Sequence, residues 1–236
     1  MRTAAILPIK SFGAAKQRLS PALGSGSRQA LAQAMFSDVL SSLRRVARLD
    51  GIAVVTADPA AEEASRGERV AVVHDELEAG QSAAASAGIR HALTSGFERV
   101  LLVPGDTPLL SPVEIDALLD RAEVDRMQVV IVPDRHGTGT NALLISPPDI
   151  FQPSFGPDSL NRHVSAAQEA GLKHSVEEVP SLLNDVDTPE DLAVLAGLLE
   201  DRRAPAPLTR GALRQLDRLR SGRRFAHDDV EPAVEV

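Results

Sequence analysis

The chain has 236 residues, which is enough for one α/β domain with an appendage and too few for two large domains. Its net charge of −8 and its lack of Trp and Tyr argue against a nucleic-acid surface, which needs a basic face and stacking rings. Because cysteine is absent, disulfides, thiolate nucleophiles and zinc sites built on thiolates are excluded.

No apolar run approaches the ~20 residues needed to cross a bilayer, so we expect no membrane partner. The apolar N-terminal patch is followed by Lys10 and Lys16, where a signal peptide would need a longer core and a cleavage site. We therefore expect a cytoplasmic protein. The six histidines show no pair at i, i+4, and we expect most of them to be ordinary surface or edge residues rather than metal ligands.

Short apolar runs predict strands, which are expected at 3–8, 52–56, 70–73, 100–103 and 129–132. Helical patterns lie between them. After a possible cap at Ser27, apolar residues recur every four positions at Leu31, Met35, Val39 and Leu43. Two further segments are typical of a capping box with Pro at the first helical position, at 111–114 and 188–191.

This alternation predicts an α/β fold with a single doubly wound, mostly parallel sheet and right-handed crossovers. Residues 135–159 break the pattern with GTGT, the strand-like ALLISP and a Pro-rich stretch, which favours a small insertion folded over one edge of the sheet. We expect the main domain to comprise residues 1–200, followed by a tail at 201–236 that is rich in Arg and then acidic.

Within the tail, Pro and Ala around 204–207 indicate a linker. After it, Leu213, Leu216 and Leu219 would line one side of a short helix. The tail either anchors a partner subunit or an acidic surface, or it is a frayed, solvated and partly disordered end. We favour the second interpretation.

The first predicted strand runs into a long loop with several glycines and the basic side chains Lys10, Lys16 and Arg18. The loop ends at a helix N-terminus, where backbone amides and the helix dipole favour anions. It would suit a triphosphate, although it matches neither the Walker A motif nor the dinucleotide fingerprint. A solvated loop explains the same residues about equally well.

Carboxylates follow two of the expected strand exits, with Asp106 in PGDTPLL and both Asp185 and Asp187 in NDVDTPEDL. Ligands of parallel sheets bind just beyond the carboxyl ends of the strands, so these side chains should converge on one edge. Magnesium typically takes one or two protein carboxylates and completes its shell with phosphate oxygens and water. The pattern predicts a magnesium site, against the simpler view that these residues only cap turns or helices.

Two further segments combine small and polar residues. In GTGTNALL and FGPDSLNRH, Thr140, Gly156 and Ser159 offer a hydroxyl and free amides for a small phosphorylated or carboxylated molecule. In AGQSAAASAGIRHAL, a helix that opens at 80–82 can pass close to a flat ring, and Gln81 can exchange hydrogen bonds with a base. The alternative for the first two stretches is a Gly-rich hairpin and an ordinary N-cap. The alternative for the third is tight packing of a helix on the sheet.

Six segments together resemble the 2-phospho-L-lactate guanylyltransferase family, also called phosphoenolpyruvate guanylyltransferase, within the nucleotidyltransferase group that contains molybdenum-cofactor guanylyltransferase. The segments are PIKSFGAAKQRL, GQSAAASAGI, LLVPGDTPLL, GTGTNALL, FGPDSLNRH and NDVDTPEDL. The likeness runs from about residue 3 to about residue 198 and leaves the tail uncovered. Where the wider group usually has LAGGxSxRMG, this chain has LPIKSFGAAKQRL, which argues against a routine sugar or molybdopterin enzyme.

The resemblance implies a Rossmann-like nucleotidyltransferase fold and transfer of GMP from GTP to phosphoenolpyruvate or 2-phospho-L-lactate, in biosynthesis of the deazaflavin coenzyme F-four-twenty. It also implies residue roles. These are catalysis by Lys16, Arg18 and Asp106; Mg²⁺ binding by Asp106 and Asp187, with Asp185 as a helper; binding of the phosphorylated acid by Thr140, Gly156 and Ser159; and nucleotide binding by Pro8, Lys10, Lys16, Arg18, Gly80, Gln81 and Ser82.

The acceptor phosphate is already ionised and would attack the α-phosphorus of GTP in line, so catalysis reduces to positioning and charge neutralisation. Two other interpretations stay open at this point. One is a glycosyltransferase that uses 185–187 as a DxD motif, and the other is a non-catalytic nucleotide sensor whose Arg-rich tail contacts a partner. The choice among phosphoenolpyruvate, 2-phospholactate and 3-phosphoglycerate also stays open, as does the oligomeric state, a homodimer included.

Overall fold

The computed structural model describes residues 1–76, 79–201 and 204–228, with the side chains of the last helix described as far as residue 218. Seven strands form one sheet in the order β3-β2-β1-β4-β6-β5-β7. Their bounds are β1 Thr3–Pro8, β2 Gly51–Thr56, β3 Val70–His74, β4 Arg99–Leu102, β5 Val129–Pro133, β6 Thr140–Ile145 and β7 His174–Val176. All neighbours are parallel except where β6 runs against β4 and β5. The prediction of a single, mostly parallel sheet is confirmed.

The five predicted strands are present, each with ends within one residue of the prediction. The predicted edge insertion at 135–159 is wrong, because its strand-like part forms β6 in the interior of the sheet. There β6 pairs on one side with β4 (Leu102 opposite Leu143) and on the other with β5 (Val129 opposite Ile145). All six residues of β6 are buried, which is what an apolar run covered on both faces requires.

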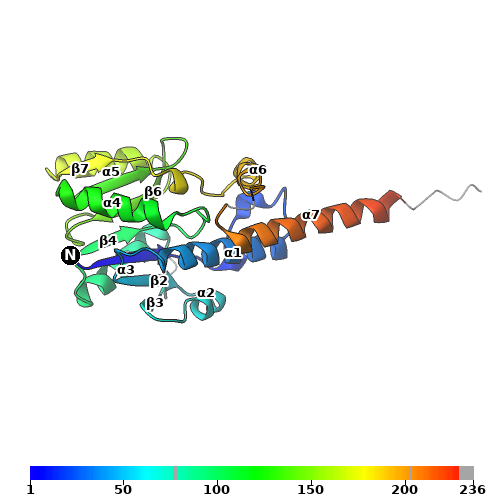
Figure 1. Ribbon diagram of the computed structural model, residues 1–236, viewed down its shortest axis with the longest axis horizontal. Helices are drawn as coiled ribbons and strands as arrows, with labels where there is room; N and C mark the ends of the chain where they lie inside the picture. Colours follow the sequence, from blue (N-terminus) through cyan, green and yellow to red (C-terminus); the bar gives the residue numbers. More distant parts are fainter. Residues whose placement is uncertain (77–78, 202–203, 229–236) are drawn as a thin grey trace, which may run out of the picture.

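Helices cover both faces of the sheet (Figure 1). The apolar residues of α1, α2 and α4 pack on one face, and those of α3 and α5 on the other. The helix bounds are α1 Ser25–Leu43, α2 Pro59–Ala64, α3 Gln81–Thr94, α4 Pro112–Val124, α5 Ser159–Glu169, α6 Pro189–Leu198 and α7 Pro207–Asp228. None of the helices in the described part of the chain is both long and apolar enough to span a membrane.

The predicted apolar stripe of α1 is confirmed, since Leu31, Met35, Val39 and Leu43 are all buried. The helix begins earlier than Ser27 and has Gly24 at its N-cap. On the other face, α3 lies so close to β1 that a methyl group at Gly88 would be 2.3 Å from Cγ2 of Ile6. Tight packing therefore accounts for at least part of the small-residue pattern in α3.

The two predicted capping boxes have different outcomes. At α6, Asp191 N donates to the Thr188 hydroxyl (3.2 Å) and Thr188 N donates back to the Asp191 carboxylate (2.7 Å), as predicted. At α4, Ser111 occupies the N-cap position, but its side chain makes no capping hydrogen bond. Glu114, the other half of that box, instead accepts from Ser181 N (2.9 Å). A tertiary contact has replaced the local one.

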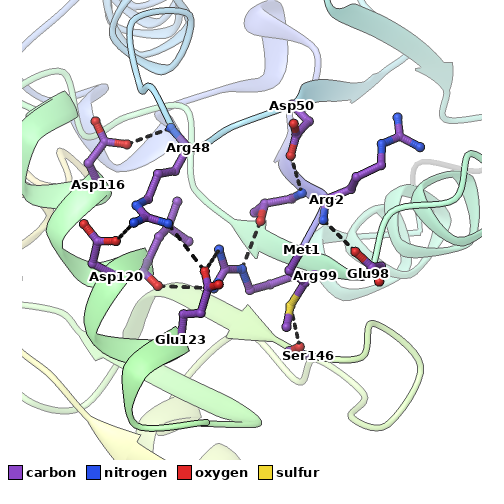
Figure 2. A network of polar contacts seen from close by, with 12 residues as sticks. Met1, Arg2, Arg48, Asp50, Glu98, Arg99, Asp116, Asp120, Glu123 and Ser146 are labelled. Atoms are coloured by element: carbon purple, nitrogen blue, oxygen red, sulfur yellow. Dashed lines mark hydrogen bonds and ion pairs between the residues drawn. The ribbon is translucent and has the colours of Figure 1, made fainter.

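An ion-pair network fixes α4 at the amino end of the strands (Figure 2). Arg99 at the start of β4 donates to the hydroxyl of Thr3 on β1 (2.9 Å) and forms a pair with Glu123 of α4 at 3.6 Å. Arg48 pairs with Glu123 and with Asp120 on the same helix. Because this network lies at the start of β1 and β4, it fixes the sheet without occupying the end from which Asp106 leaves.

The first half of α7 packs alongside α1, so the interpretation of residues 204–218 as a frayed tail is wrong (Figure 1). Leu213 and Leu216 pack against an apolar cluster that includes residues of α1 and α6. The apolar side of α7 is therefore covered by this cluster, and the leucine spacing predicted such a side. The side chain of Leu219 and residues 229–236 lie outside the described residues.

The start of α7 is anchored on Asp38 of α1. This carboxylate is 4% exposed and accepts from Leu208 N at 3.3 Å, from Thr209 N at 2.7 Å and from the Thr209 hydroxyl at 2.7 Å. Thr209 is itself fully buried. The anchor therefore satisfies three donors that would otherwise be shielded from water.

Asp38→Ala should lower the free energy of unfolding by about 3 kcal/mol, because buried donors lose a charged acceptor. Urea denaturation followed by circular dichroism measures this loss. Glu63→Ala is the control, since its pair with Arg66 is exposed, and it should change the value by less than about 0.5 kcal/mol. Equal effects of the two substitutions would show that Asp38 does not hold α7.

Candidate active site

A cavity of about 690 Å³ lies beyond the carboxyl ends of β1 and β4. The chain builds β2 and β3 on one side of β1 and places the later strands on the other, so this is the point where the strand order reverses. Open α/β sheets bind ligands at such a point, because the loops that leave neighbouring strands turn to opposite faces. The walls are formed by the loop after β1, the exit of β4, the start of α3, the start of β6 and the segments 155–159 and 185–187.

The loop after β1 is held by its own apolar and backbone contacts. Phe12 is buried, packs 5.8 Å from the ring of Phe36, and donates its backbone N–H to Asp58 (2.8 Å). Lys16 follows with φ 57° and ψ 38°, a left-handed conformation that non-glycine residues seldom adopt outside tight turns and functional sites. The side chain of Lys16 lines the cavity.

The ammonium group of Lys16 bridges two carboxylates that come from distant parts of the chain. It pairs with Asp106, which follows β4, and with Asp187 at 2.9 Å, which precedes α6. The side chain of Lys16 is only 9% exposed. Burial alone lowers the pKa of Lys16, but the charges of Asp106 and Asp187 outweigh it and raise the pKa above its ordinary value. Lys16 is therefore a fixed positive charge between the exit of β4 and the loop that precedes α6. The prediction that Asp185 and Asp187 directly follow a strand is wrong, because β7 ends at Val176 and a 3₁₀ turn at Pro180–Leu182 comes between.

Asp185 completes the acidic group on this side of the cavity. It accepts from the amide of Asn141 (3.2 Å), which also donates to the Leu182 carbonyl (2.6 Å). Burial, together with the nearby charge of Asp106, raises the pKa of Asp185 to about 6. Asn141 thus ties β6 to the segment that carries Asp185 and Asp187.

Asp187 is positioned by the cap of α6. Its backbone N–H donates to the Asp191 carboxylate (3.0 Å), which also pairs with Arg135 in the β5–β6 hairpin. Between Asp185 and Asp187, Val186 is fully buried in the same apolar cluster as Leu19 of the basic loop. Alternation along the segment therefore turns the two carboxylates to the cavity while the valine anchors them.

The residues fit a divalent cation bound by few protein ligands. Oδ1 of Asp106 is buried and has no hydrogen-bond partner among the described residues. A buried carboxylate oxygen of this kind needs a cation or water. Within the same part of the chain, no group of three or more His, Cys, Asp or Glu side chains is arranged as a ready-made cation site. Asp106 and Asp187 thus suit Mg²⁺, which completes its shell with phosphate oxygens and water.

The opposite wall is formed by Thr140, Gly156 and Ser159. Gly156 has φ 115°, which only glycine adopts readily, and its carbonyl accepts from Ser159 N at 3.1 Å. Arg162 braces this turn by donating to the Ser154 carbonyl (2.9 Å) and to the Pro157 carbonyl. The turn and the start of β6 therefore meet as one surface.

Behind that surface lies His163, which is fully buried and does not fit the expectation of a surface or edge histidine. Its ring lies 5.4 Å from that of Phe155 and 5.8 Å from that of Phe151. Nδ1 is 2.9 Å from the Thr140 hydroxyl, and Nε2 accepts from Ser154 N at 2.8 Å. The sequence signal that points to it is its spacing of four residues from Ser159 along α5.

The predicted guanine side contains Gly80 and Gln81, which both line the cavity at the start of α3. Ser82 does not line it. The Ser82 hydroxyl instead accepts from Phe155 N at 2.9 Å and so links α3 to the turn that carries Gly156. A direct contact of Ser82 with a nucleotide is therefore not what this arrangement favours.

With the exception of Ser82, the predicted site residues come together around one cavity. They are Pro8, Lys10, Lys16, Arg18, Gly80, Gln81, Asp106, Thr140, Gly156, Ser159, Asp185 and Asp187. The sequence prediction omits Asn141, Asp191 and His163, which position other site residues through hydrogen bonds. The individual roles of these residues stay predictions.

A cavity at the switch point of a doubly wound sheet, with a basic loop on one side and carboxylates on the other, defines a nucleotide-binding α/β protein. The fold is also seen in a putative nucleotide-diphospho-sugar transferase from Desulfovibrio desulfuricans G20, with a TM-score of 0.75 and 21% identity over 93% of this chain and 97% of that chain. At this identity the similarity shows the fold alone.

Residues 3–204 match the family model described as guanylyl transferase CofC like. The chain is 50% identical to a phosphoenolpyruvate guanylyltransferase of Conexibacter woesei, covering 92% of this chain and 97% of the relative. It is 35% identical to a 2-phospho-L-lactate guanylyltransferase of Methanothermobacter thermautotrophicus (81% and 83%) and 33% identical to a 3-phospho-D-glycerate guanylyltransferase of Colwellia psychrerythraea (83% and 92%). The chain belongs to the CofC-like guanylyl transferase family, as the resemblance in its sequence indicated.

The buried histidine should make stability depend on pH. Burial, with the charge of Arg162 as a second cause, lowers the pKa of His163 to about 4, whereas the unfolded chain binds the proton near 6.5. Stability from this group is complete above pH 6.5 and is lost as pH falls toward 4, by roughly 3 kcal/mol in total. Urea denaturation between pH 7 and about 4 measures this loss as the difference between wild type and His163→Gln.

His74→Gln is the matched control, since His74 is exposed and only pairs with Glu62. It should retain the loss of stability between pH 6.5 and about 4 that is attributed to His163. If His163→Gln has the same pH dependence as wild type, His163 is not the group that takes up the proton.

Proposed function

We propose that this chain transfers GMP from GTP to a phosphorylated three-carbon acid and releases pyrophosphate, as a step in the biosynthesis of the deazaflavin coenzyme F-four-twenty. The observation that carries the proposal is the bridge from Lys16 to Asp106 and Asp187 in a cavity that also contains Thr140, Gly156 and Ser159. Phosphoenolpyruvate is the acceptor that we favour, because the relative with 50% identity is named for it. The relatives named for 2-phospho-L-lactate and 3-phospho-D-glycerate define the alternatives.

The two sides of the cavity divide the work. Lys10, Lys16 and Arg18 hold the triphosphate, Pro8, Gly80 and Gln81 line the nucleoside side, and Thr140, Gly156 and Ser159 hold the acceptor acid. A phosphate oxygen of the acceptor attacks the α-phosphorus of GTP while the bond to the β-phosphate oxygen breaks. Because the attacking oxygen is already ionised, no protein side chain needs to act as nucleophile or to remove a proton.

Charge neutralisation is the main task of the remaining groups. Asp106 and Asp187 would hold Mg²⁺, with Asp185 beside them, and the bound cation would supply positive charge to the phosphate oxygens. Lys16 and Arg18 offset charge on the leaving pyrophosphate. The position of the Lys16 ammonium group in the cavity, in contact with Asp106 and Asp187, supports this role.

The proposal is tested by pyrophosphate release from GTP and Mg²⁺ with phosphoenolpyruvate, 2-phospho-L-lactate and 3-phospho-D-glycerate in separate reactions. We expect release with phosphoenolpyruvate, and the relative kcat/KM values identify the preferred acid. Asp106→Asn is the control that links the release of pyrophosphate to this cavity. It should reduce turnover by at least about 100-fold while its melting temperature stays near that of wild type. A folded wild-type protein that binds GTP but releases no pyrophosphate with any acid would be a nucleotide sensor instead.

Lys16→Met tests two roles of this side chain, which are its pairing with Asp106 and Asp187 and its proposed contact with the leaving pyrophosphate. The ammonium group lies between Asp106 and Asp187, so its removal should strengthen binding of Mn²⁺ alone by about tenfold. Turnover with GTP should fall by about 100-fold, because the leaving pyrophosphate loses a positive charge. Calorimetric titration with Mn²⁺ measures the first effect, and Lys173→Met, a substitution outside the cavity, is the control.

Unchanged Mn²⁺ affinity in Lys16→Met would mean that the cation does not compete with Lys16. The metal would then have to be placed on other groups than the Asp106 and Asp187 pair.

A further inference from the structure

We infer that His163 is a positioning residue for the acceptor acid, because it fixes the direction in which the Thr140 hydroxyl donates its hydrogen bond. The inference deepens the proposed function and rests on it, since it assumes that Thr140 contacts the acceptor. It goes beyond packing, because it assigns a definite proton arrangement to a buried pair behind the cavity wall.

The first step is the tautomer of His163. Its Nε2 is 2.8 Å from Ser154 N, and a backbone N–H can only donate. Nε2 therefore accepts this bond and carries no proton. The neutral ring must then have its proton on Nδ1. A doubly protonated ring would place the N–H of Nε2 against the N–H of Ser154, and two donors cannot form a hydrogen bond.

The second step follows along the chain of hydrogen bonds. Nδ1 lies 2.9 Å from the Thr140 hydroxyl, so the ring donates and the hydroxyl oxygen accepts. A hydroxyl that accepts from the ring keeps its own hydrogen for another partner. Thr140 is 8% exposed and lines the cavity, so the hydrogen is available there to an anionic oxygen. The order of donation thus runs from Ser154 through His163 and Thr140 toward the acceptor.

The third step concerns Gly156 and Ser159, which form the acceptor side of the cavity together with Thr140. Ser154 lies in the segment that leads to Gly156, and its carbonyl accepts from Arg162 at 2.9 Å. The same imidazole therefore joins the hydroxyl on β6 to the turn that contains Gly156. The rings of Phe151 and Phe155 enclose the imidazole and shield these bonds from water, which strengthens them.

Two substitutions of His163 separate the two bonds. The amide of Asn reaches the position of Nδ1, so His163→Asn can still donate to Thr140 but loses the bond from Ser154. The amide of Gln reaches the position of Nε2, so His163→Gln can still accept from Ser154 but no longer donates to Thr140. Both variants leave the basic loop and the carboxylates unchanged.

Steady-state kinetics are measured with GTP, Mg²⁺ and the acid that supports the fastest pyrophosphate release in wild type. For His163→Gln we expect the KM for the acid to rise by about tenfold while the KM for GTP changes less than about twofold. For His163→Asn we expect the KM for the acid to stay within about threefold of wild type. Thr140→Val should resemble His163→Gln, and the double variant should show no further loss.

Three results would overturn the inference. They are equal effects of the Asn and Gln variants on the acid, a parallel rise in the KM for GTP, and additive losses in the double variant. Thermal melting of each variant identifies a temperature at which all are folded, so that the comparison is made between native proteins.

Ring ¹⁵N NMR of the wild-type protein tests the proton arrangement independently of activity. The signals of His163 are assigned by their loss in His163→Asn. A protonated Nδ1 and an unprotonated Nε2 support the inference, and the opposite tautomer overturns it. If wild type shows the expected tautomer but releases no pyrophosphate with any of the three acids, the proposed function fails while the proton arrangement stands.

Discussion

The arrangement of the site depends on one electrostatic constraint, which is that three carboxylates lie close together, one at the exit of β4 and two in the loop before α6. Like charges in a partly dehydrated cavity repel, and the pKa of Asp185 is raised by its burial first and by the charge of Asp106 second. Lys16 offsets this repulsion by contacting both Asp106 and Asp187. The left-handed backbone of Lys16 costs on the order of 1 kcal/mol. This cost is small beside the roughly 3–5 kcal/mol that is lost when one partner of a buried ion pair is removed.

The ion pairs are held by an apolar layer behind them. Leu19, next to Arg18, and Val186, between the two later carboxylates, belong to the same buried cluster. Residues of α6 and α7 complete this cluster, and Asp38 fixes α7 to α1. The loop that supplies the positive charges and the segment that supplies the negative ones are therefore supported by a common set of contacts.

Much of the fold and of the site could be predicted, because the relevant signals are local. Apolar runs define the strands, and the place of Asp106 at the end of β4 follows from a general property of parallel sheets. Asp185 and Asp187 reach the same cavity from a loop, which no local pattern predicted. The place of β6 could not be predicted, since strand pairing joins distant residues and the same run fits an edge or an interior position. Glu114 likewise matches a capping box in sequence but bonds to Ser181, because a tertiary donor competes with the local one. His163 carries no signal of burial apart from its spacing from Ser159.

The reversed direction of β6 has a consequence for how the family can change its substrates. A parallel strand delivers only its carboxyl end to the binding edge, whereas β6 delivers its first residue, Thr140, after the hairpin loop 134–139 from β5. Under the proposed function, the acceptor side of the cavity would be formed by the hairpin and the turn before α5, and the nucleotide side by the segments that follow β1 and β4 and by the start of α3. Substitutions in those two short segments would then change the acceptor side first, and the bond from Phe155 N to the Ser82 hydroxyl would link such a change to α3. Such a division would let one fold serve relatives that are named for three different acids.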